Sequence, residues 1–238
     1  MQIIFDFPVV PRFSFENFVV CGGNKTAYHF ARKLATQDAT ENLLYVYGPE
    51  GSGKTHLLTA LSNSIGGRYL SFKDADALYR GNYPAEGLSS LSDHFADACA
   101  LILDDLHLLP DNQGVRVELW ELFNAFYTSG RKIAIAGLTP PKELPHLDGH
   151  LTSRLLWGLV ARMDVSDDDS RRMILKKLAE DHQMALPDDV IDQMLLRVRR
   201  DIPSLIYALE SINRFAIATK RKIGLRLAKE ALGLLREQ

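Results

Sequence analysis

The chain has 238 residues, which is enough for one large domain or for a large and a small one. Its formal net charge is −2, so it lacks the strongly basic field that would draw a whole protein onto DNA. Its two cysteines, Cys21 and Cys99, are too few and too far apart to predict a disulfide framework or a metal site. This cysteine usage fits a reducing cytoplasm. No apolar run approaches the length of a membrane helix, so we expect no membrane contact.

Strands and helices are predicted to alternate through the first two thirds of the chain. Residues 1–11 form an extended tail in this prediction, because Pro8 and Pro11 oppose a helix. A helix capped by Asn24 follows, and the spacing of apolar residues indicates further helices after residue 54 and around residues 119–126. Short apolar runs predict buried strands at residues 43–47, 68–72, 100–103 and 132–136. The alternation indicates the α/β class, with a parallel sheet flanked by helices.

The periodicity changes near residue 166. Ser166 and the three aspartates at 167–169 offer a cap and negative charge at a helix start. After them the spacing of apolar residues is helical only. We therefore predict an α/β base at residues 12–165 and a small all-α domain at residues 166–238.

The segment YGPEGSGKTH, residues 47–56, matches the pattern G-x-x-x-x-G-K-[ST], with a predicted strand before it and a predicted helix after it. Its glycines let backbone N–H groups point inward, and the helix adds the positive end of its dipole. Lys54 would bind the outer phosphates of a nucleotide, and the Thr55 hydroxyl would bind Mg²⁺. The alternative is a glycine-rich turn with an incidental lysine, which this context disfavours. The predicted cofactor-binding residues of the loop are Gly48, Pro49, Glu50, Gly51, Ser52, Gly53, Lys54, Thr55 and His56.

Two adjacent carboxylates, Asp104 and Asp105, follow the predicted strand at residues 100–103. In open α/β sheets, ligands bind at the carboxyl ends of the strands. We expect Asp104 to hold the metal with Thr55, directly or through water, and Asp105 to orient or deprotonate an attacking water. A solvated strand end is the plainer interpretation.

Together with other blocks, these residues resemble the nucleotide-binding AAA+ domain of the DnaA family of bacterial replication initiators. The blocks that carry the resemblance lie at residues 13–20, 44–48, 51–58, 103–106, 140–144 and 151–158. In order and spacing the resemblance runs from about residue 12 to the end. It implies a P-loop AAA+ base followed by a small helical lid, with ATP or ADP and Mg²⁺ as the bound cofactors.

The resemblance also implies roles outside the loop. Phe18, Val19 and Val20 would line the adenine pocket. Arg154 matches the arginine finger, which reaches the γ-phosphate held by a neighbouring subunit and neutralises charge in the transition state. The plainer interpretation of Arg154 is an exposed helix arginine. Since such a finger acts on a neighbouring subunit, the resemblance leaves open whether the chain forms a homo-oligomer.

Three departures from the family pattern bear on catalysis. The resemblance stops at the lid, so we expect a protein without the helix-turn-helix domain that DnaA carries. The polar first sensor of the family falls on Leu138, and the sensor arginine of the lid falls on Pro203. Arg199 or Arg200 could substitute for the latter. We expect nucleotide binding to be intact and the protein to be at most a weak ATPase.

This truncated form is similar to the Hda-type regulatory inactivators of DnaA. The resemblance implies two protein partners, the DnaA initiator and the sliding clamp of the replicative polymerase. The N-terminus, with Gln2, Phe5 and Phe7, looks like a clamp-binding peptide, which would place an amide and two rings in a groove. A tail or edge strand packed on the base is the alternative interpretation of these residues.

Two other functions remain as alternatives. One is a helicase-loader ATPase of the DnaC or IstB type, which binds single-stranded DNA. The region between the two nucleotide motifs offers only Arg68, Lys73 and Arg80 for such a role, so we expect direct DNA binding to be weak or absent. The other is a nucleotide-locked adaptor that binds partners and catalyses nothing.

Overall fold

The computed structural model describes residues 13–36, 38–73, 90–144 and 147–234, and the packing of the chain divides it into two units. The first unit spans Phe13–Asp164, and the second begins at Val165. The predicted tail at residues 1–11 lies outside the described residues. None of the helices in the described ranges combines the length and apolarity that a bilayer crossing requires.

The first unit is built on a parallel sheet of five strands in the order β2-β3-β4-β1-β5. The strands are β1 (Leu43–Tyr47), β2 (Arg68–Ser71), β3 (Ala100–Asp104), β4 (Lys132–Gly137) and β5 (Leu159–Arg162). The predicted α/β fold with a parallel sheet is thereby confirmed. The strand β5 was not predicted, because it is a four-residue edge strand with little of the continuous burial that marks the other strands.

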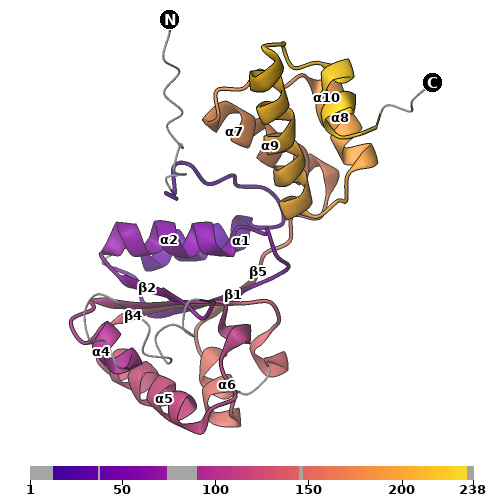
Figure 1. Ribbon diagram of the computed structural model, residues 1–238. Helices are drawn as coiled ribbons and strands as arrows, with labels where there is room; N and C mark the ends of the chain where they lie inside the picture. Colours follow the sequence, from indigo (N-terminus) through magenta and orange to yellow (C-terminus); the bar gives the residue numbers. More distant parts are fainter. Residues whose placement is uncertain (1–12, 37, 74–89, 145–146, 235–238) are drawn as a thin grey trace, which may run out of the picture. The chain divides into compact units, whose positions relative to one another are not determined.

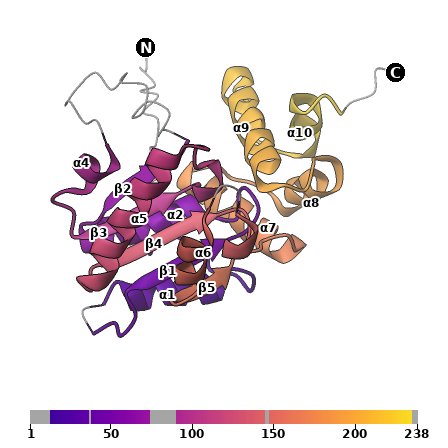
Figure 2. The ribbon, with the colours of Figure 1, turned by 90° about the horizontal axis from the view of Figure 1, so that it is seen from below.

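Helices cover both faces of this sheet, as Figure 1 shows edge-on and Figure 2 shows from the α5 side. One face is covered by α1 (Lys25–Leu34) and α2 (Lys54–Ile65), and the other by α4 (Leu91–Phe95), α5 (Gln113–Thr128) and α6 (Gly149–Leu155). The short 3-10 turns η1 (Leu106–Leu108) and η2 (Pro141–Glu143) follow β3 and β4. Parallel strands covered on both faces are expected to be largely apolar, and the three central strands β1, β3 and β4 are so, apart from Lys132 and Asp104 at strand ends.

Successive side chains of the central strand β1 point to opposite faces of the sheet, so they pack in two different cores. Leu43 and Tyr45 belong to the cluster under α4, α5 and α6, whereas Leu44 and Val46 belong to the cluster under α1 and α2. All four are at most 1% exposed. The strand is therefore fixed in its register on both sides, which positions the loop that follows it.

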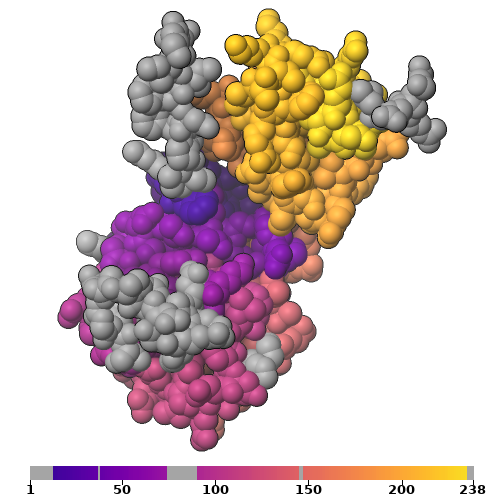
Figure 3. Space-filling model, viewed as in Figure 1, coloured from indigo at the N-terminus to yellow at the C-terminus, as the bar shows by residue number. Residues whose placement is uncertain are grey.

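The second unit is helical throughout its described part, and its helices form a packed body of their own in the space-filling view (Figure 3). It contains α7 (Asp168–Asp181), α8 (Asp188–Arg197), α9 (Ile202–Thr219) and α10 (Leu225–Ala231). Asp167 caps α7, since its side chain accepts a hydrogen bond from the Ser170 amide at 2.7 Å. The helix start expected at residues 166–169 is observed.

Candidate functional site

The glycine-rich loop joins the end of β1 to the start of α2, and its backbone needs glycine at several positions. Gly48, Gly51 and Gly53 have φ values of 156°, 77° and 95°, which side chains rarely tolerate. A Cβ atom on Gly48 would lie 1.9 Å from the Met163 carbonyl oxygen, just beyond β5. The neighbouring strand thus confines the start of the loop to glycine.

Gly48→Ala is expected to destabilise the first unit by about 3 kcal/mol, which corresponds to roughly 6–12 °C in Tm. The cause is the combined positive φ and the overlap with a backbone oxygen that cannot move cheaply. The matched control is Gly22→Ala, because a Cβ atom there meets nothing within 4 Å. Thermal melting of both variants checks this prediction, and equal melting temperatures would contradict it.

The loop contains a buried polar atom that lacks a protein partner. Ser52 is 2% exposed, and its Oγ has no hydrogen bond to any described residue. Such an orphan is costly unless a ligand satisfies it. It stands at the loop tip, directly before Gly53 and the first turn of α2, where amides and the helix dipole favour an anion. The residues present therefore fit a phosphate group.

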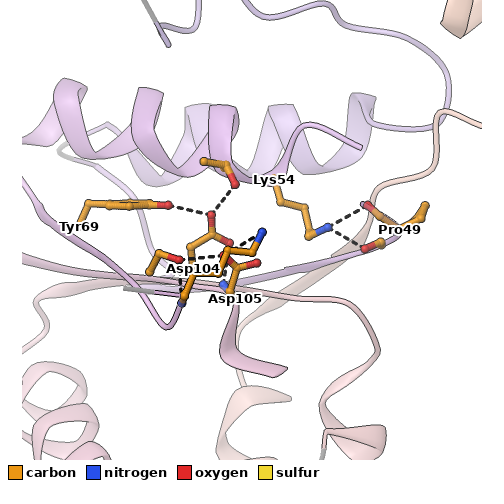
Figure 4. A network of polar contacts seen from close by, with 9 residues as sticks. Pro49, Lys54, Tyr69, Asp104 and Asp105 are labelled. Carbon is orange, nitrogen blue, oxygen red and sulfur yellow. Dashed lines mark hydrogen bonds and ion pairs between the residues drawn. The ribbon is translucent and has the colours of Figure 1, made fainter. Parts of the chain in front are cut away.

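Lys54 is held against the same loop, as Figure 4 shows. Its Nζ donates to the carbonyl oxygens of Gly48 and Pro49 at 2.7 and 2.9 Å, and the residue is only 7% exposed. Burial lowers the pKa of this amine, while Asp104 and Asp105 oppose the shift. A buried ammonium whose hydrogen bonds to described residues go to neutral carbonyls is the group that a polyphosphate would neutralise.

Asp104 lies at the end of β3 with no exposed surface. Its Oδ2 accepts hydrogen bonds from Thr55 Oγ1 at 2.6 Å and from the Tyr69 hydroxyl at 2.9 Å (Figure 4). Its Oδ1 accepts from the Asp105 amide at 2.8 Å. The structure thus brings the two predicted metal-binding residues, Thr55 and Asp104, into direct contact.

The hydroxyl of Thr55 and the carboxylate of Asp104 suit a Mg²⁺ ion that is also bound by a nucleotide, and they do not form a metal site made of protein ligands alone. A hydroxyl and a carboxylate are hard oxygen ligands, which Mg²⁺ prefers. The described residues contain no cluster of three or more histidine, cysteine, aspartate or glutamate side chains suited to a metal. A cation at Thr55 and Asp104 would therefore depend on phosphate oxygens for its remaining ligands, as in other phosphate loops.

Asp105 is engaged by a second set of side chains. Its Oδ2 accepts from Ser71 Oγ at 2.8 Å and lies 3.8 Å from Lys73 Nζ. Its φ of 55° lies in the left-handed region, at the turn into η1. Nearby, His107 Nδ1 is buried with no partner in the described ranges, and burial lowers the pKa of its ring. The carboxylate predicted to activate water is thus tied to the end of β2.

Three side chains that reach the site from β2 and the turn after it were not predicted as site residues: Tyr69, Ser71 and Lys73. They reach the site because β2 pairs with β3 in parallel, which sets Ser71 opposite Asp104. The rule that ligands bind at the carboxyl ends of strands could have indicated them, had the strand order been known.

The predicted adenine segment lies next to the loop. The Phe18 ring would contact a Cβ atom on Gly53 at 3.2 Å and stacks on Tyr28 with centroids 5.6 Å apart. Val19 and Val20 are half-buried. His56 Nε2 lies 3.0 Å from the Ser14 carbonyl oxygen, and its ring meets the Phe18 ring edge-on with centroids 5.1 Å apart, so this side chain contacts the predicted adenine segment.

Asn24 stands at the cap position of α1, but its side chain makes no capping bond. The predicted cap is therefore wrong in its mechanism. Its Oδ1 accepts from the Cys21 amide and its Nδ2 donates to the Val19 carbonyl oxygen, both at 2.9 Å. The Asn24 side chain therefore stabilises the backbone at the end of the adenine segment and not the first turn of α1.

Arg154 lies on α6, whose start is capped by Asp148 at 2.8 Å from the Leu151 amide. Its guanidinium carbon lies 4.0 Å from the ring centroid of Trp120 and 5.4 Å from that of Trp157. No carboxylate in the described part of the chain pairs with it. The guanidinium is thus placed by these two aromatic rings.

The two sensor positions are apolar, as the sequence indicates. Leu138 follows β4 and is half-buried. Pro203 lies in the first turn of α9, where a missing N–H costs nothing. The two arginines considered as substitutes are both paired within the lid: Arg199 to Asp201 at 3.1 Å, and Arg200 to Asp168 at 3.7 Å. The predicted partner-binding residues Gln2, Phe5 and Phe7 lie outside the described residues.

Comparison with known proteins extends these observations. Residues 9–162 match the family described as the bacterial DnaA ATPase domain, and residues 168–232 match the Hda lid domain. The chromosomal replication initiator DnaA of Caldanaerobacter subterraneus is 32% identical over 231 residues, which cover 93% of this chain and 52% of that protein. DnaA of Thermotoga petrophila is 30% identical, with 97% of this chain and 53% of that protein covered. The chain therefore spans about half the length of the curated relatives it matches.

Solved structures agree with this assignment. The crystal structure of domain III of Thermotoga maritima DnaA has a TM-score of 0.80 at 28% identity, and the match covers 95% of this chain and 98% of that one. The Holliday junction branch migration motor RuvB of the same organism has a TM-score of 0.66 at 16% identity over 95% of this chain and 73% of its own, which shows a shared fold alone. The AAA+ resemblance stated from the sequence is confirmed. Because the DnaA match contains the phosphate loop, Asp104 and Arg154, and extends over most of the chain, the protein belongs to the bacterial DnaA ATPase domain family and carries an Hda-type lid.

Proposed function

We propose that this protein is a regulator of chromosomal replication initiation that binds ATP or ADP with Mg²⁺, binds the sliding clamp, and stimulates ATP hydrolysis by DnaA. The observation that carries the proposal is the setting of Arg154. Its guanidinium lies over the Trp120 ring and has no acidic partner in the described residues. The Hda-type lid supports the same proposal.

Nucleotide binding is the first part of this function. It is supported by the orphan hydroxyl of Ser52, the buried amine of Lys54 and the paired Thr55 and Asp104. A solved DnaA from Aquifex aeolicus, 24% identical with a TM-score of 0.72, is bound to the ATP analogue AMPPCP. When bound here, Mg²⁺ would neutralise phosphate charge, and Thr55 and Asp104 are the residues that would hold it.

The second part of this function is hydrolysis, which we propose takes place mainly in the site of the partner DnaA and only slowly in the chain's own site. In its own site, Asp105 is bound by Ser71 and Lys73, and Leu138 offers no hydrogen bond to a phosphate or water. We therefore propose slow hydrolysis of the chain's own nucleotide. Arg154 would instead supply the cation that the transition state in DnaA requires.

The direct test uses DnaA loaded with ATP, together with sliding clamp on DNA and the full chain. Conversion of the DnaA-bound ATP to ADP is expected to accelerate when the chain is added. If the rate of conversion of DnaA-bound ATP stays unchanged when the clamp and either ATP or ADP are supplied to the chain, the result would contradict the proposal and favour a non-catalytic adaptor.

A second test concerns the N-terminal residues. Replacing Gln2 and Phe7 together by alanine is expected to abolish clamp pull-down, because an extended peptide binds through its amide and rings. Tm should change by less than about 2 °C if the tail does not pack on the base. A large fall in Tm would instead support the packed-tail interpretation.

The loader alternative is not favoured by the described contacts. Arg68 donates to the His94 carbonyl oxygen, and Lys73 is paired with Asp105. The third basic residue of this region, Arg80, lies outside the described residues. Salt-sensitive binding of a single-stranded oligonucleotide would revive this alternative.

A further inference from the structure

The hydroxyl of Tyr69 occupies an unusual place in the site. It lies 2.9 Å from Asp104 Oδ2, the same oxygen that accepts the hydrogen bond from Thr55 at 2.6 Å. Tyr69 comes from β2, two residues before the strand position opposite Asp104, and its hydroxyl points at the Asp104 carboxylate (Figure 4). Its ring packs with the core under α1 and α2. Packing and pairing therefore fix the phenol oxygen in place.

The carboxylate that it contacts is enclosed by protein. Asp104 is 0% exposed, and its other oxygen accepts from the Asp105 amide at 2.8 Å. A buried carboxylate in this position keeps its orientation only through its donors. Two of those donors are side-chain hydroxyls, and only Tyr69 is outside both nucleotide motifs.

The direction of the Thr55 hydrogen bond matters for metal binding. When Thr55 donates its proton to Asp104, the lone pairs of its oxygen are left to face a cation. If the carboxylate turned, the hydroxyl would lose this acceptor and its defined orientation. Tyr69 holds the accepting oxygen from the other side.

We propose that Tyr69 is a positioning residue for Mg²⁺, which fixes the Asp104 carboxylate so that Thr55 presents its oxygen to the metal. This inference rests on the proposed binding of a Mg-nucleotide. Partners of metal-binding groups typically change metal affinity by about 10–100-fold when they are removed. Tyr69 thus sets how strongly Mg²⁺ tightens nucleotide binding, and contacts neither the metal nor the phosphates itself.

The test is calorimetric titration of the full chain with ADP, once with excess Mg²⁺ and once with EDTA. The ratio of the two Kd values measures the gain from the metal. For Tyr69→Phe this ratio is expected to fall by about 10-fold relative to wild type, while the Kd in EDTA stays within about twofold. A purely structural tyrosine would weaken both Kd values alike, or neither, and either result would overturn the proposal.

Two further variants sharpen the test. Tyr45→Phe removes another buried hydroxyl, which donates to the Thr139 carbonyl oxygen at 2.7 Å, and is expected to lower Tm but leave the Mg²⁺ ratio unchanged. In an Asp104→Asn background, Tyr69→Phe should have no further effect on the ratio. An additive effect there would contradict the proposal. Wild type that binds no ADP would refute nucleotide binding itself, whereas wild type that binds ADP indifferently to Mg²⁺ would refute the Mg²⁺ site and the role of Tyr69 but leave nucleotide binding standing.

Discussion

Arg154→Ala is expected to reduce the stimulated hydrolysis of DnaA-bound ATP by about 10³-fold, to the rate of DnaA alone. An arginine supplied by a neighbouring subunit typically contributes 10³–10⁵ to phosphoryl transfer, because its guanidinium neutralises charge that develops in the transition state. The effect should appear in turnover and leave the affinity of this chain for its own nucleotide unchanged. Single-turnover conversion of DnaA-bound ATP measures it.

Two variants serve as controls for this prediction. Arg131→Ala removes another arginine stacked on an aromatic ring, with its Cζ 3.7 Å from the Phe126 centroid, and should retain stimulation. Arg154→Lys keeps the charge but loses the planar fork, so it should restore only a small part of the rate. Full activity of Arg154→Ala would remove the proposed mechanism, and loss in Arg131→Ala as well would point to general destabilisation.

Lys54→Met is expected to abolish the stabilisation of this protein by nucleotide. At a ligand concentration of 100 times Kd, binding stabilises the folded state by about 2.7 kcal/mol, or roughly 5–11 °C in Tm for a chain of this size. The variant should show a shift of less than about 1 °C. It keeps the apolar stem of the lysine and removes a buried charge whose pKa is lowered by burial, so its Tm without nucleotide should not fall.

The control for Lys54→Met is Lys33→Met, at an exposed position in the last turn of α1. It should melt and respond to ADP and ATP as wild type does. A Lys54→Met protein that is still stabilised by nucleotide to the wild-type extent would show that the loop does not hold the phosphates.

The parts of the fold that depend on local patterns could be predicted from the sequence. The strand before the loop is a run of five residues, of which four are fully buried, and the loop follows it directly. The strand β3 ends in two carboxylates in the same way. In both cases the apolar run and the polar residues after it are adjacent in the chain, so no knowledge of the strand order was needed.

The remaining site residues depend on contacts between distant segments. Tyr69 approaches Asp104 only because β2 and β3 are neighbours in the sheet. Arg154 is held by Trp120, which lies 34 positions earlier on α5, and periodicity alone cannot pair these residues. Asn24 is a residue type that commonly caps helices, yet its side chain forms hydrogen bonds with the backbone of Val19 and Cys21, in the segment before the helix. Tertiary contacts decide such choices.

Calorimetric titration of the purified chain with ADP and ATP in the presence of Mg²⁺ tests the central claim most directly, namely that the loop at residues 48–55 holds a nucleotide. We predict saturable binding of one nucleotide per chain, with no more than slow turnover of ATP in the same sample. Heats indistinguishable from dilution for both nucleotides, together with no change in Tm, would contradict it.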